Sequence, residues 1–108
     1  MTVNDAIELL GLETLCLPDG GREIEGGYTG DLLSWVMGRA QSGDAWVTIM
    51  TNINVVAVAQ LTDVACVIIA EGAELSEGVA ERAEAQGINL LRSKMTAWEI
   101  ISALSDKL

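Results

Sequence analysis

Residues 64–70 form an apolar run, V-A-C-V-I-I-A, that no charged or polar side chain interrupts. A strand with one face in water alternates apolar and polar residues, whereas a strand buried on both faces is apolar throughout. The run is much shorter than the roughly 20 apolar residues of a membrane-spanning helix. It therefore predicts a strand at the centre of a parallel sheet that helices cover on both faces.

Segments with strand and helix patterns alternate along the rest of the chain. Further strands are predicted at residues 12–17, 24–28, 45–50 and 88–91. Helices are predicted at residues 2–10, 31–41, 52–62, 75–86 and 96–107. This alternation indicates an α/β fold: one layered domain over residues 1–108, with a mostly parallel sheet of about five strands flanked by helices.

Two of these helices carry sequence marks of their ends. Thr2 with Asp5, and Thr96 with Glu99, have the spacing of a capping box. Residues 52–62 are ambiguous, because V-V-A-V-A suits a strand while Val55, Val58 and Thr62 share a helical face. A helix is favoured there, since parallel strands on both sides need a crossover of about a dozen residues.

Composition excludes several function classes. The chain has 16 acidic and 6 basic residues, no histidine and a net charge of −10. Such a surface repels phosphate backbones and anionic lipids, so neither nucleic acid nor membrane is an expected partner. Without histidine there is no Ser-His or Cys-His catalysis and no His-ligated metal. The sequence thus predicts no catalytic residues and no metal site, and it indicates no particular cofactor.

Cysteine usage indicates a cytoplasmic protein. The first ten residues contain Asp5 and Glu8 and no basic residue, unlike a signal peptide. Cys16 and Cys66 both lie in apolar segments, which favours two reduced, buried thiols over a disulfide between them.

Candidate binding residues lie where predicted strands end and helices begin. Ligands of open parallel sheets bind beyond the carboxyl ends of the strands, and helix N-termini there offer free N–H groups to an anion. The tentative ligand-binding set comprises Gly26, Gly27, Asp31, Asn52, Asn54, Glu71 and Gly72. The alternative is that these residues are ordinary turns and caps, which every α/β protein has.

The segment E-G-G-Y-T-G-D, residues 25–31, is rich in glycine but lacks a nucleotide-binding pattern. Neither G-x-x-x-x-G-K-[ST] nor G-x-G-x-x-G is present. A tight turn from strand to helix, with Asp31 as the N-cap residue, explains the segment equally well.

The three tryptophans receive different interpretations. Trp46 in a predicted strand and Trp98 in the last predicted helix are expected in the core or at its margin. Trp35 falls beside the predicted buried stripe of its helix, which consists of Leu32, Leu33, Val36, Met37 and Ala40. A large aromatic residue off the core face indicates a subunit interface, or else a ring folded over the edge of the stripe.

Several stretches resemble the DRTGG domain family, and the resemblance covers residues 12–101. They are G-G-Y-T-G-D-L-L-S-W-V-M, A-W-V-T-I-M-T-N-I-N-V-V-A-V-A-Q-L, V-A-C-V-I-I-A-E-G and the closing T-A-W-E-I. The family occurs alone, with CBS domains in regulated pyrophosphatases, or inside phosphotransacetylases, and a similar domain precedes the kinase domain of HPr kinase/phosphorylase. The resemblance implies an α/β fold and pairing as a homodimer, with no established catalytic activity of the domain itself.

The chain departs from the letters that give the family its name. It has Thr51-Asn52 where relatives carry Asp-Arg, and Ala70-Glu71-Gly72 where they carry Thr-Gly-Gly. The missing arginine would otherwise be a bidentate clamp for phosphate.

Together these observations favour a non-catalytic regulatory or assembly module. It would form a homodimer and sense a small anionic metabolite or nucleotide. The alternative is a small enzyme or accessory subunit that acts on a phosphorylated or acyl substrate in a metabolic or redox complex, with a protein partner.

Overall fold

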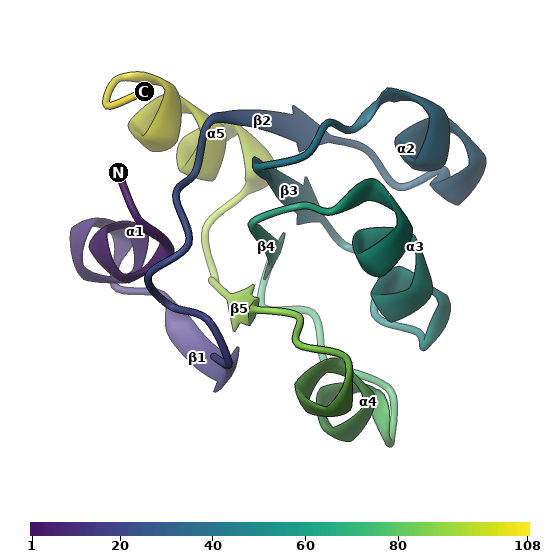
Figure 1. Ribbon diagram of the computed structural model, residues 1–108. Coiled ribbons are helices and arrows are strands. Elements are labelled where there is room, and N and C mark those ends of the chain that lie inside the picture. The colour runs from purple at the N-terminus through teal and green to yellow at the C-terminus, as the bar shows by residue number, and fades with distance from the viewer.

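A computed structural model describes residues 1–108 as a five-stranded sheet between two layers of helices (Figure 1). The strands are β1 (Glu13–Cys16), β2 (Gly26–Thr29), β3 (Asp44–Thr48), β4 (Cys66–Ile69) and β5 (Leu90–Arg92). The helices are α1 (Val3–Leu10), α2 (Leu33–Arg39), α3 (Asn54–Thr62), α4 (Val79–Ala85) and α5 (Ala97–Ser105). The predicted α/β class is confirmed, including the helix at the ambiguous residues 52–62.

The sheet has the order β1-β5-β4-β3-β2. Strands β2 to β5 are parallel to their neighbours, and only β1 runs antiparallel, next to β5. The sheet is therefore mostly parallel, as predicted. Both β1 and β2 are edge strands.

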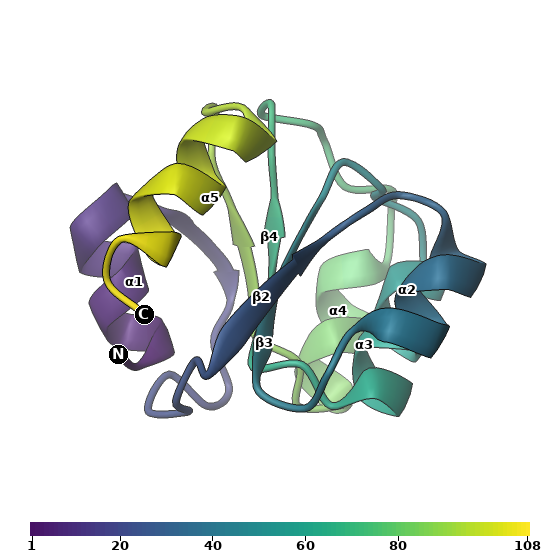
Figure 2. The same cartoon turned by 90° about the horizontal axis from the view of Figure 1, so that it is seen from above.

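Helices α2, α3 and α4 cover one face of the sheet, and α1 and α5 cover the other (Figure 2). The residues of β4 are all buried and divide between the two cores: Val67 and Ile69 face α2, α3 and α4, while Cys66 and Ile68 face α1 and α5. The uninterrupted apolar run of residues 64–70 thus corresponds to a central strand with a core on each side.

The two predicted capping boxes are present. The Thr2 hydroxyl accepts from the N–H of Asp5, the Thr96 hydroxyl accepts from the N–H of Glu99, and each carboxylate in turn accepts from the backbone of the capping residue. The local sequence is sufficient to predict these two helix starts, because each capping box supplies partners to N–H groups that the first helical turn leaves free.

The predicted start of α4 is wrong. The helix begins at Val79 rather than at residue 75, because Gly78 takes a left-handed conformation (φ 85°) that interrupts helical geometry. The preceding segment is instead held by a hydrogen bond from the N–H of Ser76 to the carbonyl of Thr51, 3.1 Å away. None of the helices is both long and apolar enough to span a bilayer.

Candidate functional site

The carboxyl ends of the four parallel strands share one edge of the sheet, called the carboxyl edge here. Asp31 follows β2, Asn52 and Asn54 follow β3, and Glu71 and Gly72 follow β4. These five predicted site residues therefore share this edge.

Gly26 and Gly27 do not belong to this group. They begin β2 instead of ending it, and they pair in register with Asp44 and Ala45 at the start of β3. The expectation that they follow a strand is wrong, because the strand continues through Tyr28 and Thr29. They lie at the amino end of the sheet, remote from the other candidates.

Asp31 is not the N-cap of α2. The cap position is Leu32, which makes no side-chain cap. Asp31 reaches across to β3 instead, where its Oδ1 accepts from the Thr48 hydroxyl at 2.7 Å and from the N–H of Ile49 at 2.9 Å. The carboxylate therefore ties the start of α2 to the end of β3.

The space between the carboxyl ends of β4 and β5 is closed by hydrogen bonds. The chain leaves β4 for α4 on one face and leaves β5 for α5 on the other, which is the arrangement that opens a ligand crevice in many parallel sheets. Here the N–H of Glu71 donates to the carbonyl of Met95 at 2.9 Å, and that of Gly72 donates to the carbonyl of Ser93 at 2.8 Å. These two amides are not available to an anion.

The loop between β3 and α3 is different. The N–H groups of three consecutive residues, Thr51, Asn52 and Ile53, donate to no group of the protein. The Asn52 side chain accepts from the N–H of Asn54 at 2.9 Å, next to the cap position Ile53, which makes no side-chain cap. These three amides are therefore free to bind a ligand, as are those of residues 31–34 at the start of α2.

Charge at the carboxyl edge does not attract anions from a distance. Asp31 and Glu71 are acidic and exposed, Lys94 lies beside Gly72, and Arg92 at the end of β5 is paired with Glu13. Long-range attraction of an anion is therefore absent, and binding there would rely on the local amides.

The second feature is an exposed apolar surface on α2. Leu32, Trp35 and Met37 are 59%, 54% and 49% exposed, and only Val36 and Ala40 of the predicted stripe are buried. We call these three exposed residues the α2 surface. Its tryptophan is held in place, because the guanidinium of Arg39 lies 3.8 Å from the centre of the Trp35 ring.

Of the other two tryptophans, both predicted in the core or at its margin, only Trp46 is buried. Trp46 is fully buried and donates its indole N–H to the carbonyl of Gly30 at 3.0 Å. Trp98 is 80% exposed, so its expected place in the core is wrong. Trp98 lies in the first turn of α5, on the side of the helix that faces away from the sheet. Ile100 and Leu104 lie on the opposite side and contact the core.

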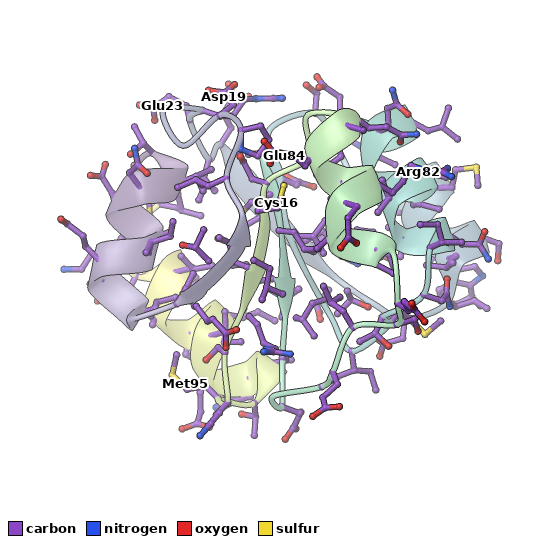
Figure 3. All side chains as sticks on the ribbon, turned by 90° about the horizontal axis from the view of Figure 1, so that it is seen from below. Cys16, Asp19, Glu23, Arg82, Glu84 and Met95 are labelled. Carbon is purple, nitrogen blue, oxygen red and sulfur yellow. The ribbon has the colours of Figure 1, made fainter.

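Both cysteines are free and lie on opposite faces of the sheet. Figure 3 shows Cys16 beside Glu84 of α4, and the thiol donates to that carboxylate at 2.9 Å. Burial, followed by this hydrogen bond, raises the pKa of Cys16 to about 12, and burial alone raises the pKa of Cys66 to about 12. Both sulfurs are therefore protonated packing groups at neutral pH, not nucleophiles. No three Cys, Asp or Glu side chains gather as a metal site.

The third feature is a cavity on the other face of β2. It has a volume of about 200 Å³ and lies between β2, the adjacent β3 and helix α5. Gly26 and Gly27, two of the predicted site residues, line it. In Figure 2 strand β2 lies between α5 on one side and α2 on the other, so this cavity and the α2 surface flank the same edge strand.

Comparison with known proteins places the fold. No protein-family model matches the chain, and neither does any curated protein. The chain is similar to a crystal structure of the CBS and DRTGG domains of the regulatory region of Clostridium perfringens pyrophosphatase, complexed with the activator diadenosine tetraphosphate. The TM-score is 0.72 at 12% sequence identity, and the match covers 94% of this chain and 46% of that one. The resemblance to a DRTGG domain predicted from the sequence is confirmed at the level of the fold.

Proposed function

We propose that the chain is a non-catalytic regulatory or assembly module that forms a homodimer through the α2 surface. The observation that carries this proposal is Trp35, a large aromatic side chain that is held by Arg39 yet leaves 54% of its surface in water. Tryptophan and arginine are the residue types most enriched among the side chains that dominate binding energy at interfaces. The similar fold in a pyrophosphatase regulatory region supports the regulatory role.

Apolar contact, not charge, drives this association. Each chain carries a net charge of −10, so two copies repel one another. Salt screens such repulsion within about 10 Å at 0.1 M ionic strength. The dimer should therefore strengthen as salt is added, which separates it from pairing through salt bridges.

Light scattering on three proteins tests the proposal: the wild type, Trp35→Ala and Trp98→Ala. The two variants remove the same side chain from exposed positions on different helices, so Trp98→Ala is the matched control. Wild type and Trp98→Ala should both give a dimer mass. Trp35→Ala should weaken the dimer by about 2 kcal/mol, or roughly 30-fold in dissociation constant. A monomeric wild type, or equal weakening by both variants, would refute the α2 surface as the interface.

The second part of the proposal is that the module senses a small anionic metabolite or nucleotide. The three consecutive amides of Thr51, Asn52 and Ile53 support it, because unpaired N–H groups in one loop are suited to phosphate oxygens. The similar regulatory region was crystallised with a dinucleotide activator. Of the predicted site residues, Asn52 and Asn54 belong to this loop or adjoin it, so they are the ones we expect to contact the anion. Asp31 instead accepts hydrogen bonds from Thr48 and Ile49.

A proline substitution tests the loop directly. Ile53 has φ −61°, which proline adopts without strain, and its N–H makes no internal bond. Ile53→Pro should therefore keep the fold but weaken the binding of inorganic phosphate or ATP, whereas Ile53→Val keeps the amide and should bind as the wild type does. Binding is measured by titration calorimetry. Equal affinity in the two variants would contradict the site, and steady turnover of ATP lost in Ile53→Pro would favour the alternative of a small enzyme.

The proposal places this module in the cytoplasm. Two buried, unpaired thiols on opposite faces of the sheet suit a reducing compartment.

A further inference from the structure

The cavity beside β2 exists because two small residues stand side by side under a helix. Gly27 of β2 pairs in register with Ala45 of β3, and together with Val47 they form the floor beneath α5. Ile101 and Leu104, one turn apart on α5, form the opposite wall. A larger side chain in place of Gly27 would project into this space, because a Cβ there has only the carbonyl oxygen of Ala45 within 4 Å, at 3.4 Å.

The chemistry of the lining is selective. No charged side chain is among the ten lining residues, and most of them are apolar. Three lining residues carry hydroxyls, but the Tyr28 side chain packs against the core on the other face of the sheet, which leaves those of Thr29 and Ser105. Each has already donated its proton to a backbone carbonyl, Thr29 to Val47 at 3.0 Å and Ser105 to Ser102 at 3.2 Å. What they offer a ligand is therefore lone pairs, which accept hydrogen bonds and repel anions.

The volume sets the size of the ligand. A cavity of about 150 Å³ lined by apolar side chains binds benzene. The present one, at about 200 Å³, has room for one such ring with a short substituent. Pockets for drug-sized molecules or nucleotides are about 300–1,000 Å³. A whole nucleotide therefore exceeds this cavity.

We propose that this cavity is a binding site for one small aromatic or branched aliphatic group that carries a hydrogen-bond donor, such as a primary amine or a hydroxyl. The apolar floor and wall bury the hydrocarbon part, and the lone pairs of Thr29 and Ser105 accept from the donor. The net charge of −10 favours an ammonium over any anion. This ligand class is neutral or cationic, unlike the anion proposed at the loop between β3 and α3, and its site is lined by β2, β3 and α5.

The test is a titration with three probes that share one ring, followed by two-dimensional NMR of the backbone amides. Benzylamine and benzyl alcohol carry a donor, while benzoate carries acceptors and a negative charge. Benzylamine and benzyl alcohol should shift the amides of β2 and of residues 101–108. Benzoate should bind at least about tenfold more weakly, a difference of about 1.4 kcal/mol.

Two valine variants make the test specific. Gly27→Val fills the cavity from its floor, and valine suits a strand. Gly21→Val is the control, since a Cβ at Gly21 meets no atom within 4 Å and its φ is not in the left-handed region. Gly27→Val should lose the benzylamine shifts, whereas Gly21→Val should keep them.

Either of two outcomes would overturn the proposal. One is that benzylamine and benzyl alcohol do not shift the amides of the wild type, or that they shift those of Gly27→Val equally. The other is benzoate binding as tightly as benzylamine, which would show that the hydroxyls do not select a donor. The NMR spectrum of Gly27→Val also shows whether the variant is folded. The outcome of the ligand titration does not depend on whether the protein dimerises through the α2 surface.

Discussion

At the carboxyl edge, Asp31, Glu71 and Gly72 are hydrogen-bonded within the protein, whereas the α2 surface leaves three large apolar side chains in water. At the carboxyl edge, Asp31 holds Thr48, and the amides of Glu71 and Gly72 hold the β5–α5 loop. On α2, Leu32, Trp35 and Met37 contribute little to the core. A predicted site residue can thus be engaged in a structural hydrogen bond, while exposed apolar area indicates where a partner binds.

If this contrast is right, substitutions at the carboxyl edge change stability, and substitutions on the α2 surface change association. The largest stability effect is expected for Asp31→Ala. It removes two hydrogen bonds to a carboxylate and leaves the buried Thr48 hydroxyl without its acceptor. Unfolding in urea should show a loss of about 2 kcal/mol.

Thr48→Val is the control for that experiment. It removes the hydroxyl and keeps the shape. The N–H of the half-buried Met50 loses its hydrogen bond to that hydroxyl, while the Asp31 carboxylate remains exposed to water and near the N–H of Ile49. The loss should be smaller, about 1 kcal/mol. If Asp31→Ala lowers the free energy of unfolding no more than Thr48→Val does, the hydrogen bonds of Asp31 to the end of β3 do not stabilise the fold as proposed.

Glu71→Gly is expected to have the opposite sign. Glu71 has φ 62°, a left-handed conformation that costs a residue with a side chain roughly 1 kcal/mol and costs glycine little. Because glycine also loses more entropy on folding, the net gain in stability should be about 0.5 kcal/mol, read from the thermal midpoint. Destabilisation instead would show that the Glu71 side chain makes a contact that holds this loop.

The fold was predictable where the determinants lie close together in sequence. The apolar run of residues 64–70 indicates a central strand, and Thr96 with Glu99 marks the start of α5, because each pattern is complete within one segment. The start of α4 was not predictable in this way. It depends on the left-handed Gly78 and on a hydrogen bond from Ser76 to Thr51 in a distant loop.

The candidate site was only partly predictable for the same reason. Asp31 has the right spacing for an N-cap, but its partner is on β3, which the local sequence does not reveal. The cavity beside β2 depends on Gly27 standing in register with Ala45, and register between strands is a tertiary property. Trp35 could be singled out, since its place off the helical stripe is local information.

The smallest expected effect concerns acid stability at the amino edge of the sheet. A hydrogen bond from the Ser42 hydroxyl, followed by one from the Arg22 guanidinium, lowers the pKa of Asp63 below its ordinary value of 3.8. A carboxyl with a lowered pKa in the folded state stabilises the protein above its ordinary pKa, and this contribution is lost as the pH falls below it.

Asp63→Asn tests this contribution and also serves as a control, because Asp63 belongs neither to the carboxyl edge nor to the α2 surface. Because Arg22 and Asp63 are in contact with solvent, the contribution is about 0.5 kcal/mol or less. Asparagine tolerates the left-handed φ of 59° at this position. The variant should lose less stability than the wild type as the pH falls from about 4 through the lowered pKa of Asp63, while its dimer mass stays unchanged. If Asp63→Asn and the wild type lose stability equally as the pH falls, the ion pair between Arg22 and Asp63 does not contribute to stability.

Hydrogen–deuterium exchange on the wild-type protein, compared between dilute and concentrated solution, shows directly whether association buries helix α2. If α2 is the dimer interface, peptides covering residues 32–39 exchange more slowly in the concentrated sample, because association buries that helix. Peptides covering residues 97–105, which include the exposed Trp98, exchange at the same rate in both samples. Protection that appears in α5 and not in α2, or equal exchange of residues 32–39 in both samples, would contradict the assignment of the α2 surface as the interface.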